Sequence, residues 1–335
     1  MHLVVEDFGV SLGKKSERLL IKQKGQVISE TPFRDIEQIT IASNGISLSS
    51  DVIHECSEYG IQISFLSFSG RPYAKLTSPN LVGTAQTRRQ QLLAYLDERG
   101  VGSSKAFVEG KIKNQANVLK YFGKYRRASD TAKYQALSAV LTQLDKARAD
   151  LAGIDGASVD QVRGQLLAVE GRAAHHYWQG IGLLLEGKAD FPGRERRGAT
   201  DPVNSALNYG YGILYNQVWS AVLLAGLDPF AGFLHTDRPG KPSLVLDLVE
   251  EFRAQVVDRI VVAMVSKGAE IAMEEDRLAA ETLRDLRRRV MERLDAEENY
   301  EGKKHRLKSI IQRQARRLAG YLRGDGNYRP FVGGW

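Results

Sequence analysis

The period of the hydrophobic pattern changes once along this chain, close to residue 82. Up to about Ser78 the sequence consists of short segments such as HLVVED, RLLIKQ and IEQITIAS, which are rich in β-branched residues and partly alternate. From Arg88 onward the apolar residues recur with the spacing of amphipathic helices. The change predicts an α+β protein, with a small N-terminal β domain over residues 1–82 and a larger all-helical domain over residues 83–335.

The net charge of +7 is placed unevenly. From Arg277 to the end there are 15 Lys or Arg residues against 8 Asp or Glu residues, so this region carries a surplus of 7 that equals the excess of the whole chain. A basic C-terminal region favours a polyanionic partner such as nucleic acid. The more ordinary interpretation is a solvated helix surface, and the charge pattern leaves both open.

Compartment and membrane association are constrained by a few residues. The single cysteine, Cys56, excludes an intramolecular disulfide and is typical of a reducing compartment. The first residues, MHLVVEDFGV, lack the basic region of a secretory signal. The most apolar stretch, Val218 to Leu234, is interrupted by Ser220 and by Asp228-Pro229. We therefore expect a cytoplasmic protein with no membrane contact.

Three separated groups of residues resemble the parts of one metal site: Glu170, His235, and the pair Asp247 and Glu250. Ser158 and Gln161 have the spacing of a capping box, which predicts the start of the helix that carries Glu170. His235 lies in a loop predicted from Asp228 to Pro242. Ser243 is a candidate cap for the helix with the acidic pair.

Carboxylates with an imidazole form the oxygen and nitrogen ligand set that suits Mn²⁺ or Mg²⁺. Asp247 and Glu250 are three residues apart, so on a helix they share one side. Taken singly, each residue has a more ordinary interpretation, as a solvated acidic pair or a structural histidine. His175 and His176 follow Glu170 by five and six residues, which turns them away from its face and excludes an H-E-x-x-H zinc site.

Several arginines could bind a phosphate backbone. Arg253 lies one turn beyond Glu250. Three more, Arg194, Arg196 and Arg197, are in a Gly- and Pro-rich loop from Gly187 to Pro202. On the last long helix an apolar row (Leu307, Ile311, Leu318 and Leu322) is flanked by Arg306, Arg313 and Arg317. Ordinary surface arginines are an equally good interpretation of each one.

The motifs occur in an order that is specific when they are taken together. They are NGISLSSDVIHECSEYGIQISFLSFSGRPYAKL in the β domain, then RRQQLLAY, KIKNQANVL, LLAVEGRAAHHYW, DPVNSALNYGYGILY, DPFAGFLHTD, LVLDLVEEFR and YRPF. Across nearly its whole length the chain resembles the spacer-acquisition integrase of CRISPR adaptation modules. The resemblance implies a metal-dependent DNA integrase with endonuclease-type phosphodiester chemistry.

The resemblance also implies roles for particular residues. Glu170, His235 and Glu250 would be the ligands of Mg²⁺ or Mn²⁺, and Asp247 would be the accessory acid of the same catalytic set. The family often has Asp at the position of Glu250. A basic residue one turn further on matches Arg253, and a tyrosine twenty residues before the histidine would be Tyr215; both would contact DNA.

The same resemblance implies a fold and an assembly. The N-terminal domain would be β-sandwich-like and would form a homodimer, and the helical domain would be catalytic. The expected partners are double-stranded DNA (the captured prespacer and the CRISPR repeat) and a small ferredoxin-like subunit. An iron–sulfur RecB-like processing nuclease is a further candidate partner.

Two other classes of function stay open on the sequence. A metal-dependent DNA nuclease of the repair type would use the same residues with water as the nucleophile. A non-catalytic DNA-binding scaffold would use only the basic surface.

Overall fold

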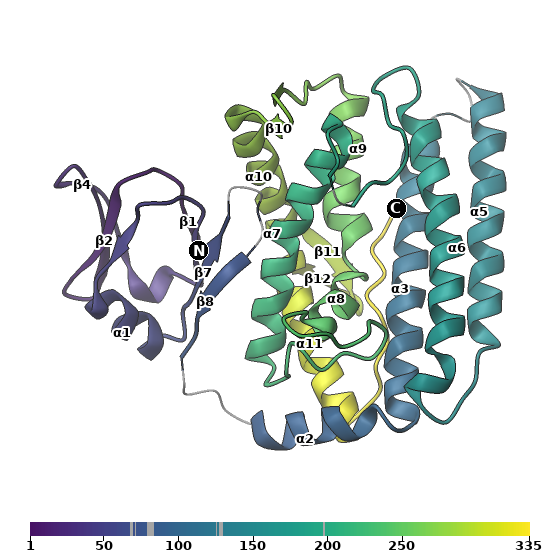
Figure 1. Ribbon diagram of the computed structural model, residues 1–335, viewed down its shortest axis with the longest axis horizontal. Helices are drawn as coiled ribbons and strands as arrows, with labels where there is room; N and C mark the ends of the chain where they lie inside the picture. The colour runs from purple at the N-terminus through teal and green to yellow at the C-terminus, as the bar shows by residue number, and fades with distance from the viewer. Residues whose placement is uncertain (68–69, 71, 79–83, 125, 127–129, 197) are drawn as a thin grey trace. The chain divides into compact units, whose positions relative to one another are not determined.

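The computed structural model describes residues 1–67, 70, 72–78, 84–124, 126, 130–196 and 198–335. The chain divides into two compact units, Met1–Val82 and Gly83–Trp335 (Figure 1). The first consists mainly of strands and the second mainly of helices, so the mixed α+β class predicted from the sequence is confirmed.

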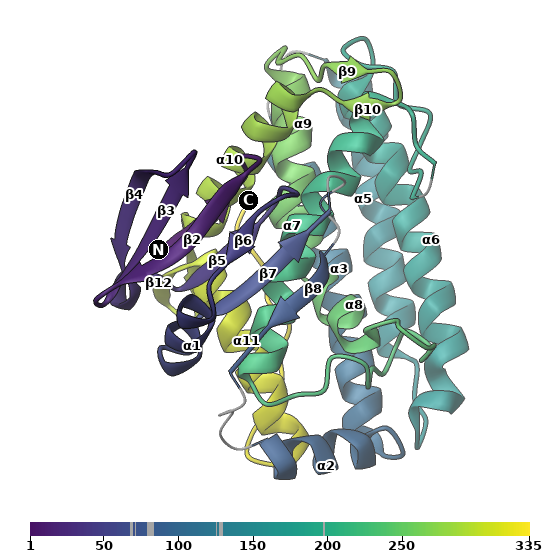
Figure 2. The ribbon, with the colours of Figure 1, turned by 60° about the vertical axis from the view of Figure 1, so that its left-hand side comes forward.

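Within the described residues, the strands of the N-terminal unit form two four-stranded sheets (Figure 2). One sheet has the order β1 (His2–Val5), β5 (Gln38–Ile41), β7 (Gln62–Leu66) and β8 (Pro72–Leu76). The other has the order β4 (Gln26–Pro32), β3 (Arg18–Gln23), β2 (Val10–Lys15) and β6 (Ser47–Leu48). A short 3₁₀ turn (Phe33–Asp35) and helix α1 (Ser50–Glu58) complete the unit.

Both sheets and α1 contribute to one core, which includes Leu12, Leu19, Ile39 and Cys56. Helix α1 begins and ends as its sequence predicts. The Ser49 side chain accepts a hydrogen bond from the Val52 N–H at 3.3 Å. Gly60 has a φ of +66°, the left-handed conformation that ends a helix.

The C-terminal unit is built from helices with a few short strands. Its helices are α2 (Thr84–Ala94), α3 (Glu98–Gly123), α5 (Thr131–Ala152), α6 (Val159–Leu185), α7 (Pro202–Leu224), α8 (Ser243–Val249), a π-helical turn (Ala254–Asp258), α9 (Arg259–Ser266), α10 (Ala280–Asp295) and α11 (Leu307–Arg323). Two hairpins, β9 (Met273–Glu274) with β10 (Arg277–Leu278) and β11 (Glu297–Tyr300) with β12 (Lys303–Arg306), accompany them.

Two groups of long helices enclose the short central segments. Helices α3, α5 and α6 pack side by side, and α7 packs against α10 and α11 (Figure 1). Helix α8 contacts α3 and α7. The π-helical turn contacts α3, α7 and α9. One continuous core fills the unit. Residues on α3, α6 and α8 that are far apart in the sequence are therefore close in space.

The last residues, after α11, return along α3 (Figure 1). Phe331 is buried and stacks on Phe252 with ring centroids 5.2 Å apart. Asn114 of α3 donates a hydrogen bond to the Phe331 carbonyl at 2.8 Å. Among the described residues, none of the helices is both long enough and apolar enough to cross a lipid bilayer.

Several local predictions were wrong. Ser158 precedes α6 in the N-cap position but makes no side-chain cap bond, and Gln161 instead accepts from the Ala157 N–H at 2.9 Å. Ser243 is the first residue of α8 rather than its cap, because its hydroxyl bonds to the Thr236 carbonyl at 3.2 Å. The two hairpins of the helical unit and strand β2, whose sequence VSLGKK alternates weakly, were not predicted.

We predict that Cys56 is strongly protected from thiol reagents in the native protein. Its side chain is buried, and burial raises the pKa of the thiol to about 12. This leaves roughly 1000-fold less thiolate at a given pH than an ordinary cysteine has. Labelling by an aromatic disulfide reagent should therefore be slower by at least about this factor than in urea. An exposed thiol on the same helix, Glu58→Cys in a Cys56→Ala background, is the control. Equal rates for the two thiols would contradict the packing of α1.

Candidate metal centre

The loop between α7 and α8 places His235 through bonds to one carboxylate. Asp247 is fully buried, and its Oδ2 accepts hydrogen bonds from the N–H groups of Phe233 at 2.7 Å and Leu234 at 3.1 Å. Its Oδ1 accepts from the His235 N–H at 2.9 Å and lies 2.7 Å from Nδ1 of the same residue. With Nδ1–H donating to Asp247, the Nε2 of His235 carries the lone pair that a metal ion requires.

The motif PFAGFLHTD allows the loop to approach α8 closely. A Cβ on Gly232 would lie 2.5 Å from Cβ of Ser243 and 2.9 Å from Oδ2 of Asp247, so only glycine fits at this position. Gln91 of α2 holds the start of the loop, because its amide donates to the Asp228 carbonyl at 2.9 Å and to the Ala231 carbonyl at 2.7 Å. The position of His235 is therefore fixed from both sides.

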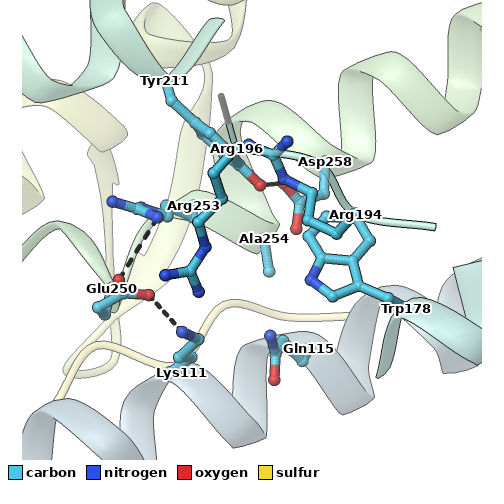
Figure 3. A pocket seen from close by; sticks show the side chains of 10 residues that line it. All are labelled: Lys111, Gln115, Trp178, Arg194, Arg196, Tyr211, Glu250, Arg253, Ala254 and Asp258. Atoms are coloured by element: carbon cyan, nitrogen blue, oxygen red, sulfur yellow. Dashed lines mark hydrogen bonds and ion pairs between the residues drawn. The ribbon is translucent and has the colours of Figure 1, made fainter. Parts of the chain in front are cut away.

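Two glutamates from different elements share one cation. Glu170 is on α6, and Glu250 directly follows α8. The ammonium of Lys111, from the middle of α3, forms ion pairs with Oε1 of Glu170 and, at 2.8 Å, with Oε2 of Glu250. Figure 3 shows the Lys111 and Glu250 side chains pointing toward each other. Two carboxylates that are distant in sequence thus converge on one position where positive charge is stabilised.

Glu250 is ionised despite its burial. Burial alone would raise the pKa of this carboxyl, but the charges of Arg253 and Lys111 oppose that effect, and the pKa is lowered to about 2. Arg253 contributes through an ion pair at 3.4 Å.

A small cavity of about 20 Å³ adjoins Glu250. Its lining includes the cations Lys111, Arg194, Arg196 and Arg253, together with Asp258 and the rings of Trp178 and Tyr211 (Figure 3). Asp258 accepts a hydrogen bond from the Tyr177 hydroxyl at 2.8 Å. Burial raises the pKa of this carboxyl. The volume is sufficient for one water molecule.

The structure brings most of the predicted site residues together. Glu170 and Glu250 share Lys111, and Asp247, three residues before Glu250, holds His235. Tyr215 is half-buried on α7, and the charge of Arg253 acts on its pKa, which burial raises. In the described part of the chain, no group of three or more His, Cys, Asp or Glu side chains is already arranged to hold a metal ion. Metal binding by these residues stays a prediction.

The family described as CRISPR associated protein Cas1 matches residues 3–296. The CRISPR-associated endonuclease Cas1 1 of Archaeoglobus fulgidus is 39% identical over 348 residues, covering 100% of both chains. The chain belongs to the Cas1 family.

Solved structures with the same fold include a casposase bound to an integration product. It has a TM-score of 0.79 and 25% identity, and the match covers 99% of this chain and 93% of the casposase. A chain of a Cas6-RT-Cas1–Cas2 complex matches with a TM-score of 0.78 and 20% identity, over 99% of this chain and 36% of that one. The latter likeness shows the fold of the Cas1 family alone.

The arginines predicted to follow DNA in this Cas1-family chain are only partly aligned. Arg306 ends β12 rather than lying on α11, so the expected row on one helix is wrong at this residue. Arg317 forms an ion pair with Glu301 and lies over the Tyr300 ring at 5.6 Å. Arg313 is exposed. Arg197 lies outside the described residues. The DNA contacts of these side chains stay predictions.

The sequence analysis missed two buried charged residues, Lys111 in the candidate site and Glu251 next to Glu250. Lys111 was not singled out, although the motif KIKNQANVL places it with Asn114 and Gln115 on one side of a buried helix. These polar residues on one side of an otherwise apolar helix were the signal that could have identified Lys111. Glu251 was overlooked because it resembles a surface acid, but it is fully buried and accepts from the Phe331 N–H at 2.9 Å.

We predict that Asp247→Asn destabilises the helical unit by about 2–4 kcal/mol, because the amide presents N–H groups to buried N–H donors. The three tryptophans, Trp178, Trp219 and Trp335, all lie in this unit. Their fluorescence during urea unfolding therefore reports on it. Asp237→Asn, an exposed residue of the same loop, should change the free energy of unfolding by less than about 0.5 kcal/mol. Equal effects of the two variants would contradict the anchoring role of Asp247.

Proposed function

We propose that this chain is a divalent-metal-dependent DNA integrase that inserts short DNA fragments into a CRISPR array. The observation that carries the proposal is the convergence of Glu170 and Glu250 on one cation position, with His235 bonded to Asp247, three residues before Glu250. Family membership supports it, as does the likeness to a casposase bound to an integration product.

The donor set fits Mg²⁺ or Mn²⁺. Glu250 is ionised, and its Oε2 is buried without a hydrogen bond of good geometry, although the Lys111 ammonium lies 2.8 Å away. Glu170 offers a second carboxylate, and His235 a nitrogen lone pair. These three residues would hold the ion, with Asp247 behind the imidazole. When bound, a divalent ion stabilises negative charge on a phosphodiester under attack.

The chain's own residues would position DNA around this centre. Arg253, held between Glu250 and the Tyr211 ring at 4.9 Å, is placed to neutralise a phosphate beside the carboxylates. In the reaction, the 3′-oxygen of the captured fragment forms a bond to the phosphorus at the repeat boundary, and the bond to the leaving 3′-oxygen breaks. The proton of the attacking hydroxyl is lost and the leaving oxygen gains one. No covalent enzyme intermediate is required.

The assembly is also proposed. One similar chain belongs to a complex that contains Cas2, and we expect a small partner subunit of this kind together with a homodimer formed through the β unit. The basic region from Arg277 onward supports a DNA partner.

The second candidate is a metal-dependent nuclease, which is favoured by the name endonuclease given to the Archaeoglobus fulgidus relative. Its chemistry would use the same residues with water as the nucleophile. Joined and cleaved products on a labelled repeat duplex distinguish the two. Strand joining supports the integrase, whereas cleavage without a joined product supports the nuclease.

We predict that His235→Ala lowers strand joining by at least about 100-fold, because even residues that only support metal ligands contribute 10–100-fold. DNA binding, measured by fluorescence anisotropy at fixed salt, should stay within about threefold, because binding depends mainly on phosphate contacts. His175→Ala, an exposed histidine of α6, is the matched control and should retain joining. Unchanged joining by His235→Ala would support a non-catalytic scaffold instead.

A further inference from the structure

The ammonium of Lys111 lies between the two carboxylates to which the proposed function assigns a metal ion. The Lys111 side chain is 8% exposed and contacts the carboxylates of Glu170 and Glu250. Unpaired charges at this depth are costly, so the ammonium stabilises both carboxylates in the protein without metal. The oxygen atoms that it contacts belong to the two glutamates that the proposed function assigns to a divalent ion. An ammonium and a dication cannot both occupy the space between these oxygens.

One turn along α3 lies a side chain with an oxygen that could accept a hydrogen bond from the ammonium. Gln115 is four residues beyond Lys111, and both side chains line the small cavity beside Glu250 (Figure 3). Gln115 is 4% exposed, and its Oε1 is buried without a hydrogen-bond partner among the residues that the structure describes. A buried carbonyl oxygen without a donor is unfavourable by itself, and an ammonium would satisfy it.

We propose that Lys111 is a displaceable cation with two positions. Without metal, its ammonium lies between Glu170 and Glu250; when a divalent ion binds these carboxylates, the ammonium moves to Oε1 of Gln115. This inference rests on the proposed function, because it assumes that Glu170 and Glu250 bind the metal. Lys111 then acts as a positioning residue: it holds the two carboxylates together before the ion arrives and competes with the ion for them.

Substitutions of Lys111 and of Gln115 should change the affinity for Mn²⁺ in opposite directions. Lys111→Met removes the competing charge, so Mn²⁺ should bind at least about tenfold more tightly, within the usual range of coupling between two sites. The same variant should unfold at a lower temperature in a chelator, because the buried carboxylates lose their cation. Its Mn²⁺-induced rise in melting temperature should exceed that of the native protein. Gln115→Leu removes the second position, so Mn²⁺ should bind about 3- to 10-fold more weakly.

The test measures binding of Mn²⁺ alone, by calorimetry and by the electron paramagnetic resonance of the free ion, on the full chain without DNA. The decisive sample is Lys111→Met/Gln115→Leu, which should bind like Lys111→Met, because Gln115 acts only through the ammonium. Lys113→Met, whose lysine pairs with Glu109 on the same helix, is the control and should bind like the native chain. If Lys111→Met does not fold, Lys111→Gln replaces it.

Two results would overturn the inference. One is an affinity of Lys111→Met equal to or weaker than that of the native chain. The other is a weakening by Gln115→Leu that persists when Lys111 is already methionine. Glu170→Gln separates these from failure of the proposed function. If native binding depends on Glu170 but Lys111→Met does not tighten it, only the role of Lys111 is wrong. If neither the native chain nor Lys111→Met binds Mn²⁺, the metal centre itself is wrong.

Discussion

The carboxylate of Asp247 satisfies three backbone N–H groups of the loop before α8 and, through Oδ1, the Nδ1 atom of His235. Without this acceptor the N–H groups would be buried and unpaired, which the loop could not tolerate at this depth. The same contact ties the loop to α8, and Glu250 directly follows that helix. The position of the imidazole and the direction of Glu250 therefore both depend on one buried side chain.

Two adjacent glutamates show how strongly the surroundings of a buried carboxyl group determine its pKa. Glu250 and Glu251 are adjacent and both buried, yet Glu250 has a pKa lowered to about 2, whereas burial raises the pKa of Glu251 to about 7. Glu250 faces Arg253 and Lys111. Glu251 instead accepts hydrogen bonds from uncharged donors, among them the Tyr328 hydroxyl, which lessen the effect of burial without cancelling it. The carboxylate beside the cavity is thus the one that is kept ionised.

The candidate site residues were named from the family resemblance, since Glu170, His235 and Glu250 taken singly have ordinary interpretations. The sequence itself predicted the change from strands to helices, because a single chain displays that pattern. It predicted the caps of α6 and α8 less well, since Ser158 and Ser243 have suitable types but the tertiary contacts of their loops compete for the same groups. Lys111 and Gln115 could not be assigned to the site from spacing alone. Their meaning depends on α3 packing against α6 and α8, which local sequence does not encode.

The π-helical turn after Arg253 helps one segment supply both a cation and an acid to the lining of the cavity. On a regular α-helix, residues five apart point about 140° away from each other. In the turn Ala254–Asp258 the hydrogen bonds join residues five apart, so such residues lie closer to one side. Arg253 and Asp258 have this separation, and both line the cavity beside Glu250 (Figure 3). A regular helix would place only one of them there. The irregular turn therefore helps to build the charged site, and it could not be predicted from the row of apolar residues in this segment.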